Sequence, residues 1–327
     1  MKTAVVTGAA SGIGMGYALA LVEQGYHVLV TDIDMVGAER VTAELNGIGP
    51  GTAEARYLDV ADADAVATLV QQVKNEHGRL DMIFNNAGLA IGGPVHDLTL
   101  AHWQRAADVN VMGVVHGVDA AYKIMVEQGY GHIVNTASIA GLVPAAFMGP
   151  YNMSKHAVVG LTLSLRGEAA AHGVKVVCVC PIAVHTDLPR RLNDGLEKLP
   201  ETEIAASLYD RFDSLFRALP EFVIASPEGH GRKVLRAVER NRAFVIEPWF
   251  GRPVWWLQRL FPTLPVTLSV AATLAWKAAQ PYLDRVAQRL TRTDPPALAP
   301  TALGTAQPAG SPQTFPTEPA DSSVSVE

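Results

Sequence analysis

Short apolar runs alternate with longer stretches of helical periodicity through most of this chain. The short runs are rich in Val and Ile and end in turn-forming residues, as parallel strands buried on both faces do. The predicted strands are Ala4–Gly8, His27–Asp32, Ala55–Val60, Leu80–Gly88, Gly131–Ser138, Val174–Pro181 and Arg242–Pro248. The predicted helices are Met15–Glu23, Met35–Leu45, Ala61–His77, Ala101–Glu127, Tyr151–His172 and Ser226–Glu239. Because strands joined through helices cross over right-handedly, the alternation predicts an α/β fold, a doubly wound parallel sheet of about seven strands with helices on both faces.

Charge and cysteine content exclude several classes of function. The chain has 26 Lys and Arg against 32 Asp and Glu, a net charge of −6, so we expect no nucleic-acid partner. Its two cysteines, Cys178 and Cys180, share one face of a predicted strand, which favours buried, reduced thiols. No metal-ligand spacing is evident, and we expect no metal. Glycines interrupt the opening segment too early for a signal peptide, which predicts a cytoplasmic protein.

A glycine-rich turn follows the first predicted strand, in the sequence TGAASGIG. Gly8 permits a tight turn, Gly12 allows backbone to approach a pyrophosphate, and Gly14 allows the next helix to pack on the strand. The free N–H groups and the dipole of that helix would face the phosphates. A Rossmann-type dinucleotide site is therefore predicted, and its candidate residues in this turn are Gly8, Ser11, Gly12, Ile13 and Gly14.

Asp32 ends the second predicted strand, where its carboxylate would accept hydrogen bonds from both ribose hydroxyls of the adenosine. Its charge would repel a 2′-phosphate, and the glycine turn itself contains no Arg or Lys, so NAD is favoured over NADP. Asp59 and Val60 close the third strand in a position suited to the adenine edge. Further cofactor contacts are expected at the end of the fourth strand, from Asn86, Ala87 and Gly88.

Tyr151 and Lys155 are four residues apart and would share one face of a helix that starts after Gly149-Pro150. Ser138 ends the fifth strand and would point into the same crevice. Free tyrosine has a pKa of about 10, which a nearby ammonium and a positive nicotinamide ring would lower, making the phenol a better acid/base. Asn110 would hold a water that links the lysine to solvent.

Together these motifs resemble the single-domain short-chain dehydrogenase/reductase family over about residues 1–250. The resemblance implies that Tyr151 is the catalytic acid/base, that Ser138 orients the carbonyl or alkoxide, and that Asn110 maintains a proton relay. Lys155 would bind the nicotinamide ribose and tune Tyr151. Two further cofactor positions follow from the resemblance, Pro181 and Thr186. One residue departs from the family pattern, because Ile182 stands where the family usually has glycine.

The predicted substrate is a lipophilic secondary alcohol or ketone, because the loops expected to border the reacting carbon carry hardly any charge. Arg190 and Arg191 are the only basic candidates nearby, and we interpret them as a solvated surface pair. The predicted function is therefore an NAD-dependent alcohol dehydrogenase or ketone reductase. The alternative from another class is a non-catalytic dinucleotide-binding sensor or scaffold, which often lacks the tyrosine or the lysine. A sugar-nucleotide epimerase shares the Tyr-Lys spacing but has wider glycine spacing.

Composition divides the chain into three predicted segments. Residues 1–247 form the Rossmann-type catalytic domain, and residues 248–292 hold four of the five tryptophans with six basic residues against one acidic residue. That extension suits either peripheral contact with a membrane surface or packing on the subunit or its mate. Residues 293–327 are rich in proline and predict a disordered tail. A homodimer or homotetramer is expected from the resemblance.

Overall fold

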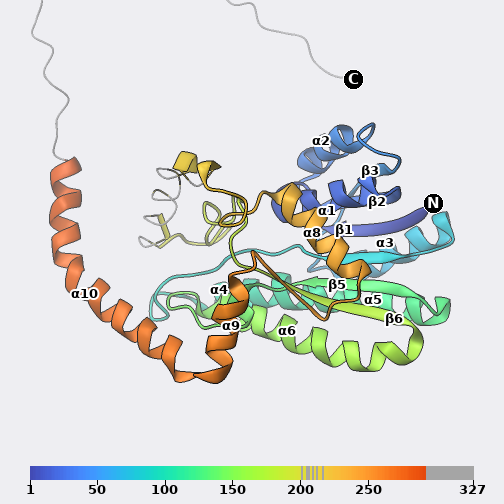
Figure 1. Ribbon diagram of the computed structural model, residues 1–327. Coiled ribbons are helices and arrows are strands. Elements are labelled where there is room, and N and C mark those ends of the chain that lie inside the picture. Colours follow the sequence, from blue (N-terminus) through green and yellow to red (C-terminus); the bar gives the residue numbers. More distant parts are fainter. Residues whose placement is uncertain (200–201, 204–206, 208–209, 211–212, 216, 292–327) are drawn as a thin grey trace, which may run out of the picture. The chain divides into compact units, whose positions relative to one another are not determined.

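A seven-stranded parallel sheet forms the centre of the fold (Figure 1). The computed structural model describes residues 1–199, 202–203, 207, 210, 213–215 and 217–291. In this part of the chain the strand order is β3-β2-β1-β4-β5-β6-β7, and every neighbouring pair is parallel. The strands are β1 (Lys2–Thr7), β2 (Tyr26–Asp32), β3 (Thr52–Tyr57), β4 (Met82–Asn85), β5 (Gly131–Thr136), β6 (Val174–Pro181) and β7 (Phe244–Glu247). The order reverses between β1 and β4, which is where open parallel sheets bind ligands.

Helices cover both faces of this sheet, and each face has its own apolar core. The helices against one face are α1 (Gly12–Glu23), α2 (Met35–Leu45) and α8 (Pro227–Glu239). Those against the other are α3 (Ala63–His77), α5 (Gly113–Gln128) and α6 (Gly149–Ala169). Neighbouring residues of β1 divide between the two cores, Val6 facing α1 and Val5 facing α3. The predicted doubly wound fold is therefore confirmed.

Two of the predicted elements differ from the structure in ways that affect the site. The helix predicted over Ala101–Glu127 is interrupted: α4 (Leu100–Ala107) leads through a π-helical turn (Asp108–Met112) into α5. Such turns insert a residue into a helix and often mark functional positions, and this one contains Asn110. The third strand begins earlier than predicted and ends at Tyr57, so Asp59 and Val60 lie in the loop after β3.

Two helices follow β7, namely α9 (Gly251–Leu260) and α10 (Thr263–Thr291). The chain divides into two compact units, Met1–Ala275 and Trp276–Glu327. Within the first unit, Trp255 of α9 packs against Phe244 of β7 with ring centroids 5.1 Å apart. No helix in the described part of the chain is long and apolar enough to cross a membrane. The tail predicted for residues 293–327 lies outside the described residues, and the segment boundary at residue 247 stays a proposal from composition.

Candidate active site

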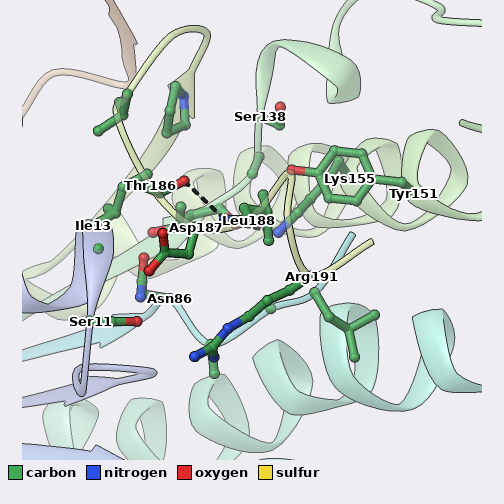
Figure 2. Close-up of a pocket in the computed structure, with 18 of the residues that line it drawn as sticks. Ser11, Ile13, Asn86, Ser138, Tyr151, Lys155, Thr186, Asp187, Leu188 and Arg191 are labelled. Atoms are coloured by element: carbon green, nitrogen blue, oxygen red, sulfur yellow. Dashed lines mark hydrogen bonds between the residues drawn. The ribbon is translucent and has the colours of Figure 1, made fainter. Parts of the chain in front are cut away.

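A cavity of about 240 Å³ opens at the carboxyl ends of the central strands (Figure 2). It lies where the strand order reverses, beside the start of α1. Eleven of the predicted site residues line it: Ser11, Gly12, Ile13, Asn86, Ala87, Gly88, Ser138, Tyr151, Lys155, Pro181 and Thr186. Residues that are more than a hundred positions apart in the sequence therefore line the same cavity. This agrees with the prediction that they share one ligand crevice.

Steric contacts explain two glycines of the turn after β1. Gly8 has φ of +64°, and a Cβ there would lie 2.7 Å from the Cα of Ala87. A Cβ on Gly14 would lie 2.1 Å from the carbonyl oxygen of Gly8, so only glycine lets α1 pack this closely on the turn. The amide of Asn86 donates to the carbonyl oxygens of Thr7, at 3.0 Å, and of Gly8, at 3.2 Å, which ties the loop after β4 to the turn.

The N-terminus of α1 faces this cavity with the properties of an anion site. Gly12 and Ile13, the first residues of the helix, both line the cavity. The N-cap residue Ser11 makes no side-chain capping hydrogen bond, and the first turn contains no acidic residue. Unsatisfied backbone N–H groups and the helix dipole both favour a bound phosphate at such a position.

Tyr151, Lys155 and Ser138 converge on the cavity (Figure 2). Tyr151 and Lys155 lie one turn apart near the start of α6, and the Lys155 Nζ is 5.7 Å from the centroid of the Tyr151 ring. Lys155 is only 4% exposed and donates to the carbonyl oxygen of Thr136 at 3.1 Å. Ser138 follows β5, where its hydroxyl accepts a hydrogen bond from the backbone N–H of Ala140 at 3.1 Å.

Burial controls the proton affinities of this pair. Desolvation raises the pKa of Tyr151, and the Ser138 hydroxyl acts in the opposite direction. Desolvation also lowers the pKa of Lys155, to about 8. Both shifts favour the uncharged side chains. The lowering predicted for the Tyr151 pKa depends on a bound positive nicotinamide, whereas in the protein alone desolvation of the phenol raises that pKa.

Asn110 is fully buried behind the cavity wall, in the π-helical turn. Its amide bonds both backbone groups of Leu89, accepting from the N–H and donating to the carbonyl oxygen, each at 2.9 Å. It also donates to the Ser154 hydroxyl at 3.0 Å. A Cβ on Gly88 would lie 3.1 Å from the Asn110 Oδ1 and 3.3 Å from the Lys155 Nζ. The missing side chain at Gly88 therefore leaves open the space between these two polar groups.

Asp32 lies outside the cavity wall, at the end of β2. Its carboxylate accepts from the N–H of Ala10 and from the N–H of Asp34, each at 3.0 Å. The sequence contains no base within the glycine turn, but the fold brings one to it: an Arg40 guanidinium nitrogen donates to the Ala10 carbonyl oxygen at 3.2 Å. Arg40 belongs to α2, and no local sequence signal links it to the turn.

Comparison with known proteins identifies the family. A sequence profile described as short chain dehydrogenase matches residues 2–197. The chain belongs to the short-chain dehydrogenase family. It is 33% identical over 247 residues to the oxidoreductase SadH of Mycobacterium tuberculosis, which covers 75% of this chain and 85% of SadH. It is 38% identical over 194 residues to D-threitol dehydrogenase of Mycolicibacterium smegmatis, covering 59% of this chain and 74% of that protein.

A solved member of the family has the same architecture. A short-chain dehydrogenase/reductase from Burkholderia phymatum, in complex with NAD, has a TM-score of 0.71 at 29% identity, covering 80% of this chain and 94% of that one. The predicted family is therefore confirmed, and the chain is an oxidoreductase with a Rossmann-type fold.

Ile182 stands where the short-chain dehydrogenase pattern usually has glycine, and its side chain lies close to the start of α9. Ile182 lines the cavity, and its backbone N–H donates to the carbonyl oxygen of Glu247 at 3.0 Å. A Cβ on Gly251 would lie 2.6 Å from the Cγ2 of Ile246 and 3.5 Å from the Cγ2 of Ile182. Glycine at 251 therefore lets the start of α9 approach this isoleucine. The side chain that replaces the family's glycine packs between the cavity and the C-terminal extension.

Other predicted positions differ from expectation. Arg190 and Arg191 were predicted to form a solvated surface pair. Arg191 is exposed and also lines the cavity. The Arg190 side chain is only 29% exposed and forms ion pairs with Asp187 and, at 3.2 Å, with Asp213. Val60 is buried outside the cavity. Its side chain packs against residue 113 so closely that only glycine fits there. Leu89, Asp187 and Leu188 lie in loops that were expected to border the reacting carbon, and they line the cavity. Three further wall residues carry no sequence motif and were not predicted: Thr136, Ala137 and Val184.

Proposed function

We propose that this protein is an NAD-dependent dehydrogenase of a lipophilic secondary alcohol, acting also as the matching ketone reductase. The observation that carries the proposal is the placement of Tyr151 and Lys155 in one cavity with the N-terminus of α1. Bound NAD would supply the hydride acceptor for alcohol oxidation. The α1 N-terminus would hold its diphosphate, Asp32 its adenosine ribose, and Lys155 its nicotinamide ribose. Gly8, Gly14, Asn86 and Ala87 would shape the site, while Asp59, Val60, Gly88, Pro181 and Thr186 would border the cofactor.

Tyr151 would move the proton. Its phenol would donate to a ketone oxygen, or as phenolate accept from an alcohol hydroxyl, while the Ser138 hydroxyl orients the same oxygen. Burial makes the phenolate costly in the protein alone. The ammonium of Lys155 and the positive charge of the oxidised nicotinamide would offset that cost when NAD is bound.

Asn110 would complete the path by which the proton leaves. The space beside Gly88 adjoins both the Asn110 Oδ1 and the Lys155 Nζ, so a water placed there would have polar partners on both sides. The backbone bonds to Leu89 fix the orientation of the amide. Asn110 is thus proposed as a positioning residue for the relay rather than as a group that touches substrate.

We infer an apolar reacting part of the substrate from four apolar side chains of the cavity wall, those of Leu89, Ile182, Val184 and Leu188. The same wall also carries two charged residues, Asp187 and Arg191. Burial of each additional substrate methylene contributes about 0.8 kcal/mol, which corresponds to roughly a fourfold gain in affinity.

A panel of secondary alcohols of increasing chain length tests the function. With NAD, we expect kcat/KM to rise by roughly fourfold per methylene until the cavity is filled, measured through NADH absorbance. Polyols and hydroxy acids of equal size serve as matched polar controls. Higher kcat/KM for those polar substrates would overturn the proposed substrate class, and no turnover of any alcohol or ketone would overturn the proposed reaction.

We further propose that the extension, residues 248–292, contacts a membrane surface beside the cavity, in keeping with the expected cytoplasmic location. In the described part of this segment, large apolar side chains lie exposed, including Trp256 at 57%, Leu260 at 68% and Leu268 at 59%. Such a concentration of exposed apolar side chains is unusual for a surface that faces only water. Arg252 and Arg259 lie exposed in the same region, and the first acidic residue after Glu247 is Asp284. This charge complements anionic headgroups.

A pocket of about 340 Å³ between residues 144–146 and residues 266–274 of α10 supports this location. It places this part of the extension beside the loop that precedes α6, the helix of Tyr151. Ile182 makes a second connection, between the cavity wall and the start of α9. A lipophilic substrate dissolved in the bilayer would then reach the cavity by a short route.

Vesicle sedimentation tests the membrane contact. We expect the full-length protein to pellet with vesicles containing phosphatidylglycerol, and less with pure phosphatidylcholine. Burial of one leucine contributes about 1.5–3 kcal/mol, so the double variant Leu260→Glu and Leu268→Glu should partition at least about tenfold more weakly. The control Ile48→Glu changes an apolar side chain of similar exposure, 53%, that lies outside the extension. Equal pelleting of all three proteins would refute the membrane contact.

We also propose a homodimer or homotetramer, with the surfaces of α4–α5 and α6 as contacts. On α6, Met153 and Leu163 are exposed at 44% and 40%, so this helix offers apolar side chains to a second copy of the chain.

A further inference from the structure

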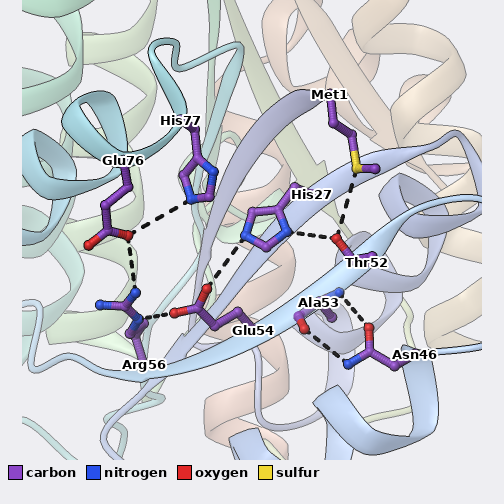
Figure 3. Close-up of polar contacts among 9 residues, drawn as sticks. All are labelled: Met1, His27, Asn46, Thr52, Ala53, Glu54, Arg56, Glu76 and His77. Atoms are coloured by element: carbon purple, nitrogen blue, oxygen red, sulfur yellow. Dashed lines mark hydrogen bonds and ion pairs between the residues drawn. The ribbon is translucent and has the colours of Figure 1, made fainter.

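Two histidines and a glutamate form a cluster at a part of the sheet that the proposed active site does not use (Figure 3). His27 comes from β2, Glu54 from β3 and His77 from the last turn of α3. One ligand atom from each residue lies within 4.8 Å of the other two. The centroids of the two imidazole rings are 4.5 Å apart.

Strand register explains why these residues meet. His27 pairs with Thr52 and Leu29 pairs with Glu54, so side chains alternating along both strands bring His27 and Glu54 to one face. Leu29 packs in the same core as Val66, Val70 and Val73 of α3, which places α3 over this face. His27 lies near the amino end of β2, whereas the cavity lies at the carboxyl ends of the strands. The cluster is therefore separate from the cavity.

Two nitrogens of the cluster are buried without a hydrogen-bond partner, the Nε2 atoms of His27 and His77. Their nearest carboxylate oxygens are too distant for good hydrogen bonds: Glu54 Oε2 is 3.6 Å from His27 Nε2, and Glu76 Oε2 is 3.9 Å from His77 Nε2. Buried polar atoms without partners are uncommon in folded proteins, and each one requires an explanation such as an ion.

Neighbouring groups prepare His27 to act as a ligand. Its Nδ1 is 2.7 Å from the Thr52 hydroxyl oxygen, and that hydroxyl is directed at the Met1 sulfur, 3.8 Å away. The Thr52 oxygen therefore accepts from Nδ1–H, which leaves the lone pair on Nε2, the arrangement usual for a metal-bound imidazole. Burial and the neighbouring His77 also lower the pKa of His27, which favours the neutral ring.

The charges around the cluster also suit a cation. Glu54 and Glu76 contribute two negative charges, and Arg56, paired with both carboxylates, contributes one positive charge. With neutral imidazoles the group is left with one net negative charge. Arg56 contacts Glu54 through Oε1, so Oε2 remains directed at His27.

We propose that His27 Nε2, His77 Nε2 and Glu54 Oε2 bind one divalent metal ion of the zinc class, with solvent completing the coordination. Zinc–nitrogen and zinc–oxygen bonds of about 2.0–2.2 Å in a tetrahedron separate the ligand atoms by roughly 3.4 Å. The 3.6 Å between His27 and Glu54 is close to that separation. Two histidines and one carboxylate form a donor set that zinc uses in proteins. The ion would join β2, β3 and the end of α3.

Zinc titration of the tag-free, chelator-treated protein tests the site. Competition with a chromophoric zinc indicator should reveal one bound equivalent, and the Tm should rise with added zinc. The variants His77→Gln and Glu54→Gln should each lower the affinity at least about tenfold, and Thr52→Val, which removes the acceptor for Nδ1, by about tenfold. The control His96→Gln removes a histidine whose side chain is 84% exposed and should leave the affinity unchanged.

Two outcomes would overturn the site: zinc binding to the wild type no tighter than to His77→Gln and Glu54→Gln, or an X-ray absorption spectrum without imidazole scattering. Circular dichroism checks that the variants are folded, and Glu54→Gln keeps the shape of the side chain. Because the cluster is separate from the cavity, NADH binding should be the same in all variants. The zinc measurement therefore does not depend on the proposed dehydrogenase activity.

Discussion

Replacing Tyr151 with phenylalanine should lower kcat by about 10²–10⁴-fold, the usual contribution of a positioned acid/base. Phenylalanine keeps the ring near the Lys155 Nζ and removes only the hydroxyl at the cavity. NADH affinity should change little, because the proposed phosphate and ribose contacts come from α1, Asp32 and Lys155. Steady-state turnover and a titration of NADH fluorescence measure the two quantities separately.

Tyr57→Phe is the matched control, since it removes a hydroxyl from a tyrosine that is 62% exposed on β3. Its turnover should equal that of the wild type. Wild-type kcat in Tyr151→Phe would refute the acid/base assignment. A large loss of NADH binding in that variant would instead assign the hydroxyl a role in holding the cofactor.

Replacing Asp32 with alanine should shift cofactor preference away from NAD. Hydrogen bonds to a charged group contribute about 1.5–3 kcal/mol, so kcat/KM with NAD should fall by roughly 10–100-fold. Activity with NADP should rise, because a carboxylate no longer repels the 2′-phosphate and Arg40 lies beside the same turn. The ratio of kcat/KM for the two cofactors is the measurement.

The Asp32 carboxylate also accepts from the N–H groups of Ala10 and Asp34, so alanine removes structural contacts as well. Asp32→Asn is therefore the better control, because its amide oxygen keeps an acceptor and only the charge is lost. If the charge of Asp32 sets the cofactor preference, Asp32→Asn and Asp32→Ala should change the ratio of kcat/KM for NAD and NADP by similar amounts. Adding Arg40→Ala to either variant should then reverse the increase in activity with NADP. An unchanged ratio in both single variants would refute the ribose role of Asp32.

The sequence determined the parts of this protein that depend on local chain geometry. Strand and helix periodicities predicted the doubly wound sheet, because burial on two faces requires those patterns. The glycines at 8 and 14 lie in one turn, and Tyr151 and Lys155 lie on one helical face, so residue spacing alone placed them. The predicted fold class also placed the ligand crevice, because doubly wound parallel sheets bind ligands beyond the carboxyl ends of their strands.

Tertiary structure decided the features that depend on contacts between distant segments. The π-helical turn at Asn110 reflects bonds to Leu89, which no helical periodicity encodes. Burial of Tyr151 reverses the pKa shift expected from charge alone, because desolvation depends on the whole surrounding wall. Arg40 at the glycine turn and Ile182 beside Gly251 were likewise invisible in the sequence.

The cluster of His27, Glu54 and His77 is the clearest case of this kind. Its members are separated by more than twenty residues in the sequence, and no metal-ligand spacing connects them. Strand register and helix packing bring them together, and both are fixed by the burial of apolar side chains elsewhere in the fold. Local spacing can therefore predict sites formed by one turn or one helix, whereas sites assembled across the sheet require the folded structure.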